Sequence, residues 1–291
     1  MALRIATRGS KLALTQAGEV AELLGGAELV EASSDGEPGD KARFVRGVER
    51  ALLAGEAEVG VHSAKDLPGE MAAELEIGGV PPREDPADVW IGAGASLEDV
   101  PEGARVGTAS LRRRAQLLAA RPDLRVQELH GNVDTRLRKL AEGELDAIVL
   151  AAAGLRRLGR ASEIGFAFPF ETMVPAPGQG TLVLQIRAGD DAASEATAAV
   201  FDLDAARELT AERASVRLLG ADCTSPVGVF ARVDGTQLEV TAFVGLPDGS
   251  EWLRDRVEGD AAEPTAVGVQ LAERLLGAGA RDLLDRAGEM A

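Results

Sequence analysis

Short apolar segments alternate with longer segments of helical spacing through the first two thirds of the chain. Leu3–Thr7 has the pattern of a strand, and Leu12–Leu24 repeats its apolar positions along one face of a helix. The same order recurs further along the chain. We predict strands at Val59–His62, Arg105–Gly107, Arg125–Leu129 and Ala147–Leu150, and helices around Val45–Ala54, Leu111–Ala120, Val133–Ala141 and Leu155. This alternation predicts an α/β architecture with largely parallel strands.

Two proline-rich segments interrupt this pattern, at Pro81–Pro86 and at Val174–Gly180. Proline and glycine break regular structure, so both segments are candidate crossovers between domains. An apolar strand at Thr181–Ile186 follows the second segment. We infer that the chain leaves one α/β domain, builds a second, and returns to the first.

After about residue 200 the pattern changes. A helix at Ala205–Leu219 precedes strands near Val227–Val233, Gln237–Val244 and Trp252–Val257, and a last helix covers Val267–Leu276. Consecutive strands followed by a helix indicate a small α+β domain with an antiparallel sheet. We therefore predict three domains: residues 1–82 with 178–200, residues 83–177, and residues 201–291.

The composition restricts the partners of this protein. The chain of 291 residues has 48 acidic and 31 basic residues and a formal charge of −17, which argues against a nucleic-acid partner. No apolar run approaches the ~20 residues that span a bilayer, and no apolar leader follows the N-terminus. We expect a cytoplasmic monomer that acts on a small molecule. Its acidic, lysine-poor surface fits either a salt-rich cytoplasm or a GC-rich genome.

Three predicted strands end in Gly, Ser, Thr or Arg where a helix begins. These ends are Thr7–Ser10, Gly107–Arg113 and His130–Asn132, the last before a helix that carries Arg136. Backbone N–H groups at a helix N-terminus favour an anion, and hydroxyls and arginine side chains complete such a site. The pattern indicates a polyanionic ligand. The alternative is that the hydroxyl residues are helix caps and the arginines are solvated.

Asp66 follows the apolar strand at Val59–His62 and stands next to Lys65. A neighbouring cation favours the ionised carboxylate. Such a carboxylate can hold a substrate N–H group and stabilise a positive charge that develops during a reaction. A loop ion pair without a catalytic role fits the same spacing.

The chain has a single cysteine, Cys223, so no disulfide forms within it. Its neighbours in Gly220–Pro226 are small, polar and turn-forming, which favours an accessible thiol over a small buried side chain. The two histidines, His62 and His130, lack the spacing of metal ligands, and we predict no metal site.

Taken together, these segments closely resemble the porphobilinogen deaminase family. The resemblance runs in order over nearly the whole chain. It is carried by Arg4–Ser10, His62–Pro68, Arg83–Pro86, Val106–Arg113, Gly131–Arg136, Ala153–Leu158, Pro177–Gly180, Glu212–Ala214 and the Cys223 loop.

The resemblance implies two α/β domains like those of periplasmic binding proteins around a hinged cleft, with a small α+β C-terminal domain. It implies a transferase that condenses four porphobilinogen molecules head to tail, each with loss of ammonia, and releases hydroxymethylbilane. It also implies a dipyrromethane cofactor bound through the sulfur of Cys223, and a catalytic Asp66. Residues that match cofactor or substrate contacts are Arg8, Ser10, Ser63, Lys65, Thr108, Ser110, Arg112, Arg113, His130, Gly131, Asn132, Arg136 and Gln179.

Three features depart from the family pattern. His130 stands where the family usually has an arginine, and a neutral imidazole loses a bidentate carboxylate contact. Ala109 replaces a typical hydroxyl residue, which removes one possible hydrogen bond. The segment 33–44 is shorter than the mobile active-site loop of the family, in which Lys41 and Phe44 have counterparts. Two other classes of protein stay open. One is a solute receptor of the same architecture, and the other is a cysteine hydrolase that uses Cys223 with His62 or His130.

The mass of the intact protein separates these classes, because a covalent dipyrromethane adds two porphobilinogen units, each without its ammonia. We expect Cys223→Ser to give a folded protein that lacks the added mass, shows no pink colour with an aldehyde reagent for pyrroles, and makes little hydroxymethylbilane. A serine variant that turned over porphobilinogen at the parent rate would refute the thioether role.

Overall fold

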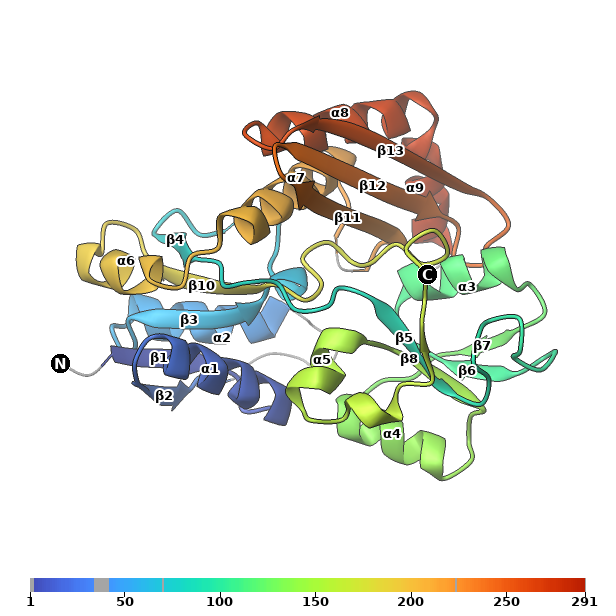
Figure 1. The fold of residues 1–291 in the computed structure, drawn as a ribbon, viewed down its shortest axis with the longest axis horizontal. Coiled ribbons are helices and arrows are strands. Elements are labelled where there is room, and N and C mark those ends of the chain that lie inside the picture. Colours follow the sequence, from blue (N-terminus) through green and yellow to red (C-terminus); the bar gives the residue numbers. More distant parts are fainter. Residues whose placement is uncertain (1–2, 34–41, 70, 223, 291) are drawn as a thin grey trace. The chain divides into compact units, whose positions relative to one another are not determined.

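The computed structural model describes residues 3–33, 42–69, 71–222 and 224–290, with the side chains of residues 42–44 left out (Figure 1). The chain divides into two compact units. The first consists of residues 1–84 and 180–206, and the second of residues 85–179 and 207–291.

The first unit contains a five-stranded sheet in the order β2-β1-β3-β10-β4. β1 pairs in parallel with β2 and β3, and β10 pairs antiparallel with β3 and β4. The apolar side chains of β1, β3 and β10 form a core with the apolar face of α1. The elements are β1 (Leu3–Thr7), α1 (Lys11–Leu23), β2 (Ala27–Glu31), α2 (Ala42–Leu53), β3 (Val59–Ser63), the 3₁₀ turn η1 (Ala64–Asp66), β4 (Leu75–Gly79), β10 (Leu182–Arg187) and α6 (Asp191–Ala198).

The second unit begins with a sheet of the same design, in the order β7-β6-β8-β5-β9. β6 is parallel to β7 and β8, and β5 is antiparallel to β8 and β9. The elements are β5 (Asp88–Gly92), β6 (Arg105–Gly107), α3 (Leu111–Ala120), β7 (Arg125–Gln127), α4 (Val133–Ala141), β8 (Ala147–Ala151), α5 (Ala152–Arg157), the 3₁₀ turn η2 (Ala161–Glu163) and β9 (Phe166–Ala167).

The C-terminal part of the second unit is an antiparallel sheet in the order β11-β12-β13. Helices α7, α8 and α9 contribute Leu219, Leu271 and Leu283 to the core that they form with this sheet. The elements are α7 (Leu203–Leu219), β11 (Val227–Asp234), β12 (Gln237–Gly245), β13 (Trp252–Asp260), α8 (Pro264–Gly277) and α9 (Ala280–Glu289).

The predicted fold class is confirmed, with two α/β sheets and a small antiparallel C-terminal sheet. The expectation of largely parallel strands holds for β1 to β3 and for β6 to β8. One strand in each α/β sheet differs: β5 and β10 run against their neighbours. Each follows directly after the chain passes from the other unit, so no crossover helix within its own sheet precedes it.

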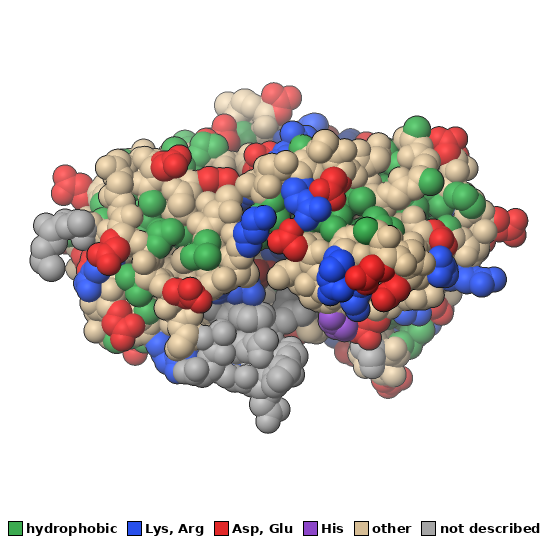
Figure 2. Space-filling model, turned by 90° about the horizontal axis from the view of Figure 1, so that it is seen from below, with side chains coloured by type: hydrophobic (Ala, Val, Ile, Leu, Met, Phe, Trp, Pro, Cys, Tyr) green, Lys and Arg blue, Asp and Glu red, His purple; other side chains and the backbone are tan. Residues whose placement is uncertain are grey.

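The sequence pattern does not predict β2, β4, β5, β9 or α6. The C-terminal sheet belongs to the same compact unit as the second α/β sheet, and the division into three domains stays a prediction. None of the described helices is long and apolar enough to cross a membrane. Acidic side chains are spread over the face seen in Figure 2, with basic ones among them.

Helices α7 and α8 approach each other closely where α8 has a glycine. A Cβ added at Gly268 would lie 2.2 Å from the backbone oxygen of Ala211. The Ser215 hydroxyl is 2.8 Å from the Gly268 oxygen and 3.0 Å from the Ala211 oxygen, and donates to both. Backbone therefore meets backbone at this position, and no flexible side chain is available to yield.

We expect Gly268→Ala to lower the free energy of unfolding by about 1–3 kcal/mol, because the added methyl group overpacks this contact. Gly277→Ala is the matched control in the same helix, since a Cβ there meets nothing within 4 Å. It should be neutral or stabilise by up to ~1 kcal/mol through helix propensity. Urea unfolding measures both variants, and equal effects would contradict the packing argument.

Candidate active site

Asp66 ends the turn that follows β3 in the first unit. The backbone of this turn is held by the Ala64 N–H, which donates to the Thr181 oxygen at 3.0 Å. The Asp66 side chain is 46% exposed, and its Oδ2 lies 3.6 Å from Nη1 of Arg8, which follows β1. Arg8 and Asp66 are both predicted site residues, and they are 58 positions apart in the chain. They meet at the carboxyl ends of the neighbouring parallel strands β1 and β3.

The segment that carries Arg8 is fixed by a helix cap. The Ser10 Oγ accepts a hydrogen bond from the Ala13 N–H at 3.3 Å and so caps α1. The Thr7 hydroxyl donates to the Ala13 oxygen at 3.2 Å. For Ser10 the structure therefore shows the capping role that the sequence left open, and this cap fixes the chain next to Arg8.

His62 lies on β3, four positions before Asp66, but it does not face solvent. It is 5% exposed, and its Nε2 is 2.9 Å from Oε1 of Gln185, whose Nε2 in turn donates to Glu49. Because the Gln185 oxygen accepts, we assign the His62 proton to Nε2. Burial lowers the pKa of His62 to about 4, against opposing effects of the Gln185 hydrogen bond and the Asp66 charge. His62 is therefore neutral near pH 7, and its Nε2 is already engaged.

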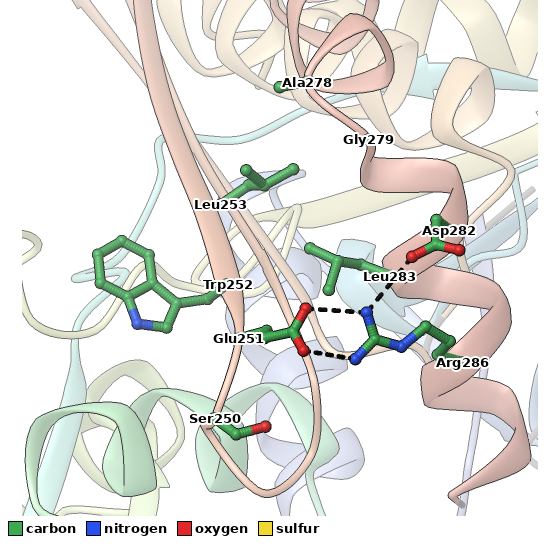
Figure 3. A pocket seen from close by; sticks show the side chains of 9 residues that line it. All are labelled: Ser250, Glu251, Trp252, Leu253, Ala278, Gly279, Asp282, Leu283 and Arg286. Carbon is green, nitrogen blue, oxygen red and sulfur yellow. Dashed lines mark hydrogen bonds and ion pairs between the residues drawn. The ribbon is translucent and has the colours of Figure 1, made fainter.

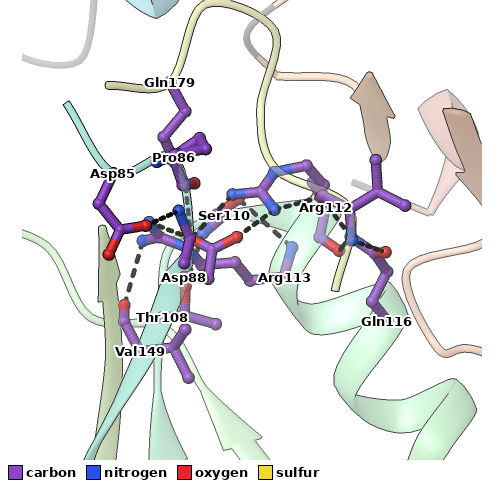
Figure 4. A network of polar contacts seen from close by, with 12 residues as sticks. Asp85, Pro86, Asp88, Thr108, Ser110, Arg112, Arg113, Gln116, Val149 and Gln179 are labelled. Carbon is purple, nitrogen blue, oxygen red and sulfur yellow. Dashed lines mark hydrogen bonds and ion pairs between the residues drawn. The ribbon is translucent and has the colours of Figure 1, made fainter. Parts of the chain in front are cut away.

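In the second unit, several predicted residues gather around Asp88, a carboxylate that is fully buried at the start of β5 (Figure 4). Arg112 binds it with two nitrogens, Nη1 at 2.5 Å and Nη2 at 3.2 Å. Arg113 Nε lies at 2.8 Å and Gln179 Nε2 at 3.1 Å. Burial by itself favours the neutral acid, but the charges of Arg112 and Arg113 hold the pKa of Asp88 below its ordinary value.

The same two arginines also donate hydrogen bonds to backbone oxygens. Arg112 Nη1 also donates to the Val174 oxygen at 2.7 Å, and Gln116 binds both the N–H and the oxygen of Val174. Arg113 Nη1 donates to the Val149 oxygen at 3.0 Å. Arg112 and Arg113 are 4% and 6% exposed. The structure places both arginines inside the protein, which excludes the alternative of solvated side chains. Their assignment to an anion site stays a prediction.

Three predicted polar residues make local hydrogen bonds at the starts of α3 and α4. The Ser110 Oγ accepts from the Arg113 N–H at 3.4 Å, and the Thr108 Oγ1 accepts from the Ser110 N–H at 3.2 Å. The Asn132 Oδ1 accepts from the Thr135 N–H at 2.8 Å. Ser110 is therefore a helix cap, the alternative that the sequence left open for the hydroxyl residues, and Asn132 caps α4 in the same way.

Arg136 is the predicted residue with the clearest capacity to bind an anion. Its Nε donates to the Gly131 oxygen at 2.9 Å, and it has no carboxylate partner among the described residues. Burial, and then the charge of Arg113, lower the pKa of Arg136 to about 10. Gly131 has a φ of +116°, and a Cβ there would press on the Thr135 side chain at 2.9 Å. The loop before α4 thus needs glycine to bring its carbonyl to Arg136.

Four predicted residues stay apart from these groups or lie wholly or partly outside the described part of the chain. His130 is 73% exposed, and its Nε2 lies 2.8 Å from the Glu128 carboxylate. Lys41 and Cys223 fall outside the described residues, and Phe44 belongs to α2 with its side chain outside them. Among the residues described, no group of three or more His, Cys, Asp or Glu is arranged to hold a metal ion.

Sequence reasoning missed Asp88 and Gln116. Asp88 follows the charged and proline residues of Arg83–Pro86 and directly precedes the apolar run Val89–Ile91, and an acidic residue at such a boundary is ordinarily solvated. The available signs of burial were this apolar run and the surplus of arginine at the start of α3, which a buried carboxylate would balance.

A pocket of about 430 Å³ lies in the C-terminal part of the second unit, away from these residues in the chain (Figure 3). Arg286 crosses it to bind Glu251 at 2.6 and 2.8 Å and Asp282 at 3.3 Å. None of the predicted site residues lines this pocket, so it adds nothing to the candidate active site.

The burial of His62 predicts a pH dependence of stability. Between pH 6.5 and 4 the unfolded chain binds a proton at this histidine and the folded protein does not, so stability falls as the pH falls through this range. We expect the parent to lose roughly 3 kcal/mol more than His62→Gln between pH 7 and pH 4. Urea unfolding across this range measures the difference, and identical pH profiles would contradict the burial of a neutral imidazole.

Comparison with known proteins shows the family to which the chain belongs. Residues 3–195 match the model of the porphobilinogen deaminase, dipyromethane cofactor binding domain, and residues 206–277 match the porphobilinogen deaminase, C-terminal domain. Relatives named porphobilinogen deaminase include one from Syntrophus aciditrophicus, 43% identical over 97% of this chain and 98% of its own. Another, from Thermus thermophilus, is 45% identical over 96% and 97%.

Among solved structures, a putative methionine-binding lipoprotein from Bacillus subtilis is similar with a TM-score of 0.43 and 14% identity. The match covers 68% of this chain and 89% of that protein. The family models cover most of the chain, and the relatives match it from end to end. This chain belongs to the porphobilinogen deaminase family.

Proposed function

We propose that this protein is a transferase that joins four porphobilinogen molecules head to tail and releases hydroxymethylbilane by hydrolysis. In each condensation the C–N bond of the aminomethyl group of one porphobilinogen breaks and its nitrogen leaves as ammonia. The remaining methylene carbon bonds to the free α-carbon of a pyrrole, which gives up a proton. Family membership supports this reaction over a solute receptor or a cysteine hydrolase. The structural observation that carries the proposal is the exposed Asp66 carboxylate beside Arg8.

Asp66 has the properties that this reaction needs. Loss of ammonia leaves positive charge on the pyrrole, and a fixed carboxylate stabilises such charge and accepts the pyrrole N–H. The 3.6 Å between Asp66 Oδ2 and Arg8 Nη1 is longer than a hydrogen bond. Arg8 therefore orients the carboxylate electrostatically, and the oxygens of Asp66 keep their capacity to accept from the substrate.

The donor set of the second unit fits the dipyrromethane cofactor for which the first matched domain is named. Each pyrrole ring of that group carries an acetate and a propionate. Arg136 is a desolvated cation without a carboxylate partner in the described residues, and the charge of Arg113 adds to its field. Arg136 would hold one of these carboxylates, and the nearby charge of Arg113, whose own nitrogens bind Asp88 and Val149, would strengthen the attraction. When bound, the cofactor supplies a covalent primer, and its predicted attachment is Cys223.

The other predicted ligand contacts stay predictions, as do a monomeric state and a cytoplasmic location. They are Ser10, Ser63, Lys65, Thr108, Ser110, Arg112, His130, Gly131, Asn132 and Gln179, together with Lys41 and Phe44 of the segment 33–44. Lys65 is half-buried next to Asp66, where its ammonium would pair with a substrate carboxylate.

We expect Asp66→Ala to lower porphobilinogen turnover at least about 100-fold, the scale of removing one preorganised electrostatic group. The assay uses purified holoprotein whose cofactor mass has been verified, so that failed cofactor assembly is not mistaken for failed turnover. Asp146→Ala is the control, since Asp146 is 49% exposed and pairs with Arg105 away from the site residues. Turnover of Asp66→Ala near the parent rate would remove Asp66 from the mechanism.

A further inference from the structure

We propose that Asp88 is a positioning residue, whose buried carboxylate holds three predicted ligand-binding residues, Arg112, Arg113 and Gln179, in one arrangement. This inference rests on the proposed function, in which those three residues are predicted ligand contacts. Asp88 itself is fully buried and does not touch the ligand. Its role is to fix the positions of the three side chains that donate hydrogen bonds to it.

The contacts of Asp88 are shared among all three partners. Its Oδ1 accepts from Arg113 Nε, Arg112 Nη2 and Gln179 Nε2, and its Oδ2 accepts from Arg112 Nη1. A buried carboxylate of this kind is tolerated only when donors satisfy its oxygens. Conversely, two buried guanidinium groups side by side repel each other unless an anion lies between them. The carboxylate and its partners therefore determine one another's positions.

The network divides the two arginines between different tasks. Arg112 reaches past Asp88 to the Val174 oxygen, which Gln116 also binds, so it anchors the segment that leads to Gln179. Arg113 instead donates to the Val149 oxygen, and its positive charge helps to lower the pKa of Arg136. Figure 4 shows both arginines at Asp88 and the contact that Arg113 makes with Val149. Asp88 therefore links Arg113, whose charge acts on Arg136, to Arg112, which binds the second crossover segment at Val174.

Gln179 connects the two crossover segments of the second unit. Its Nε2 donates to the Pro86 oxygen at 2.7 Å as well as to Asp88. The chain enters the unit near Pro86 and leaves it at Gln179. One carboxylate thus fixes the start of α3 and the end of the second crossover in a single geometry. Loss of its charge frees these groups, and misplaced donors bind ligand carboxylates more weakly.

The test uses Asp88→Asn, which keeps the shape of the side chain and removes its charge. The matched control is Asp123→Asn in the same unit, where the carboxylate binds Arg121 at 2.7 and 2.8 Å and contacts no predicted site residue. For each purified protein we would measure the fraction that carries the dipyrromethane mass, KM and kcat for porphobilinogen in that fraction, and the urea midpoint.

A positioning role predicts that Asp88→Asn reduces the fraction with bound cofactor and raises KM at least about tenfold, with kcat of the loaded fraction changed less than KM. Asp123→Asn shifts the urea midpoint and leaves KM and the cofactor fraction at parent values. If Asp88→Asn lowers the urea midpoint while KM and cofactor loading stay at parent values, its role is structural and the proposal is overturned.

Asp88→Glu keeps the proposal testable if Asp88→Asn does not fold. It retains the charge but adds a methylene that displaces the arginines, so KM should lie between those of the parent and the asparagine variant, at least about threefold above the parent. A folded glutamate variant with parent KM overturns the positioning role. A parent protein with neither the added mass nor turnover overturns the proposed function itself, which no result on the Asp88 variants alone does.

Discussion

The fully buried carboxylate of Asp88 determines how three segments of the second unit meet. It lies at the start of β5, and its partners come from the first turn of α3 and from the end of the second crossover. A charge inside a protein must be matched by donors, and each partner must in turn be placed to match it. The ligand contacts predicted for Arg112 and Arg113 at the start of α3 therefore depend on their ion pairs with Asp88.

The same constraint explains how a strongly acidic protein can hold an acidic ligand. The chain carries a formal charge of −17, which repels anions at long range. Asp88 neutralises one of two adjacent arginines and leaves a net positive charge near Arg136. Arg136 is desolvated and has no carboxylate partner in the described part of the chain, so a ligand carboxylate would gain both its charge and its hydrogen bonds.

The two α/β sheets place their polar groups in the same way. In the first unit Arg8 follows β1 and the Asp66 turn follows β3, and these strands are parallel neighbours. In the second unit Thr108 follows β6 and Asn132 follows the loop after its parallel neighbour β7. The carboxyl ends of parallel strands open onto helix N-termini, where backbone N–H groups point outward. Each unit therefore offers its own set of donors and acceptors.

Much of the site was predictable because its signals are local. A strand that ends in Thr7–Ser10 and a helix that begins after Ser110 are encoded by adjacent residues, and the caps form as their spacing indicates. The exposed position of Asp66 follows from its place just after a buried strand. The ordered series of motifs indicated the family because each motif occupies contiguous positions.

The tertiary structure alone decided which of these residues are buried and what they bind. Asp88 is 24 positions from Arg112 and 91 from Gln179, and its neighbours in the sequence do not show which distant residues it binds. His62 and the antiparallel strands β5 and β10 likewise depend on segments far along the chain. Helix caps and strand periodicity arise from neighbours in sequence, so the sequence by itself determined them. Buried ion pairs and sheet order arise from chain segments that meet only on folding, and pairwise chemistry between distant residues leaves no periodic pattern to read.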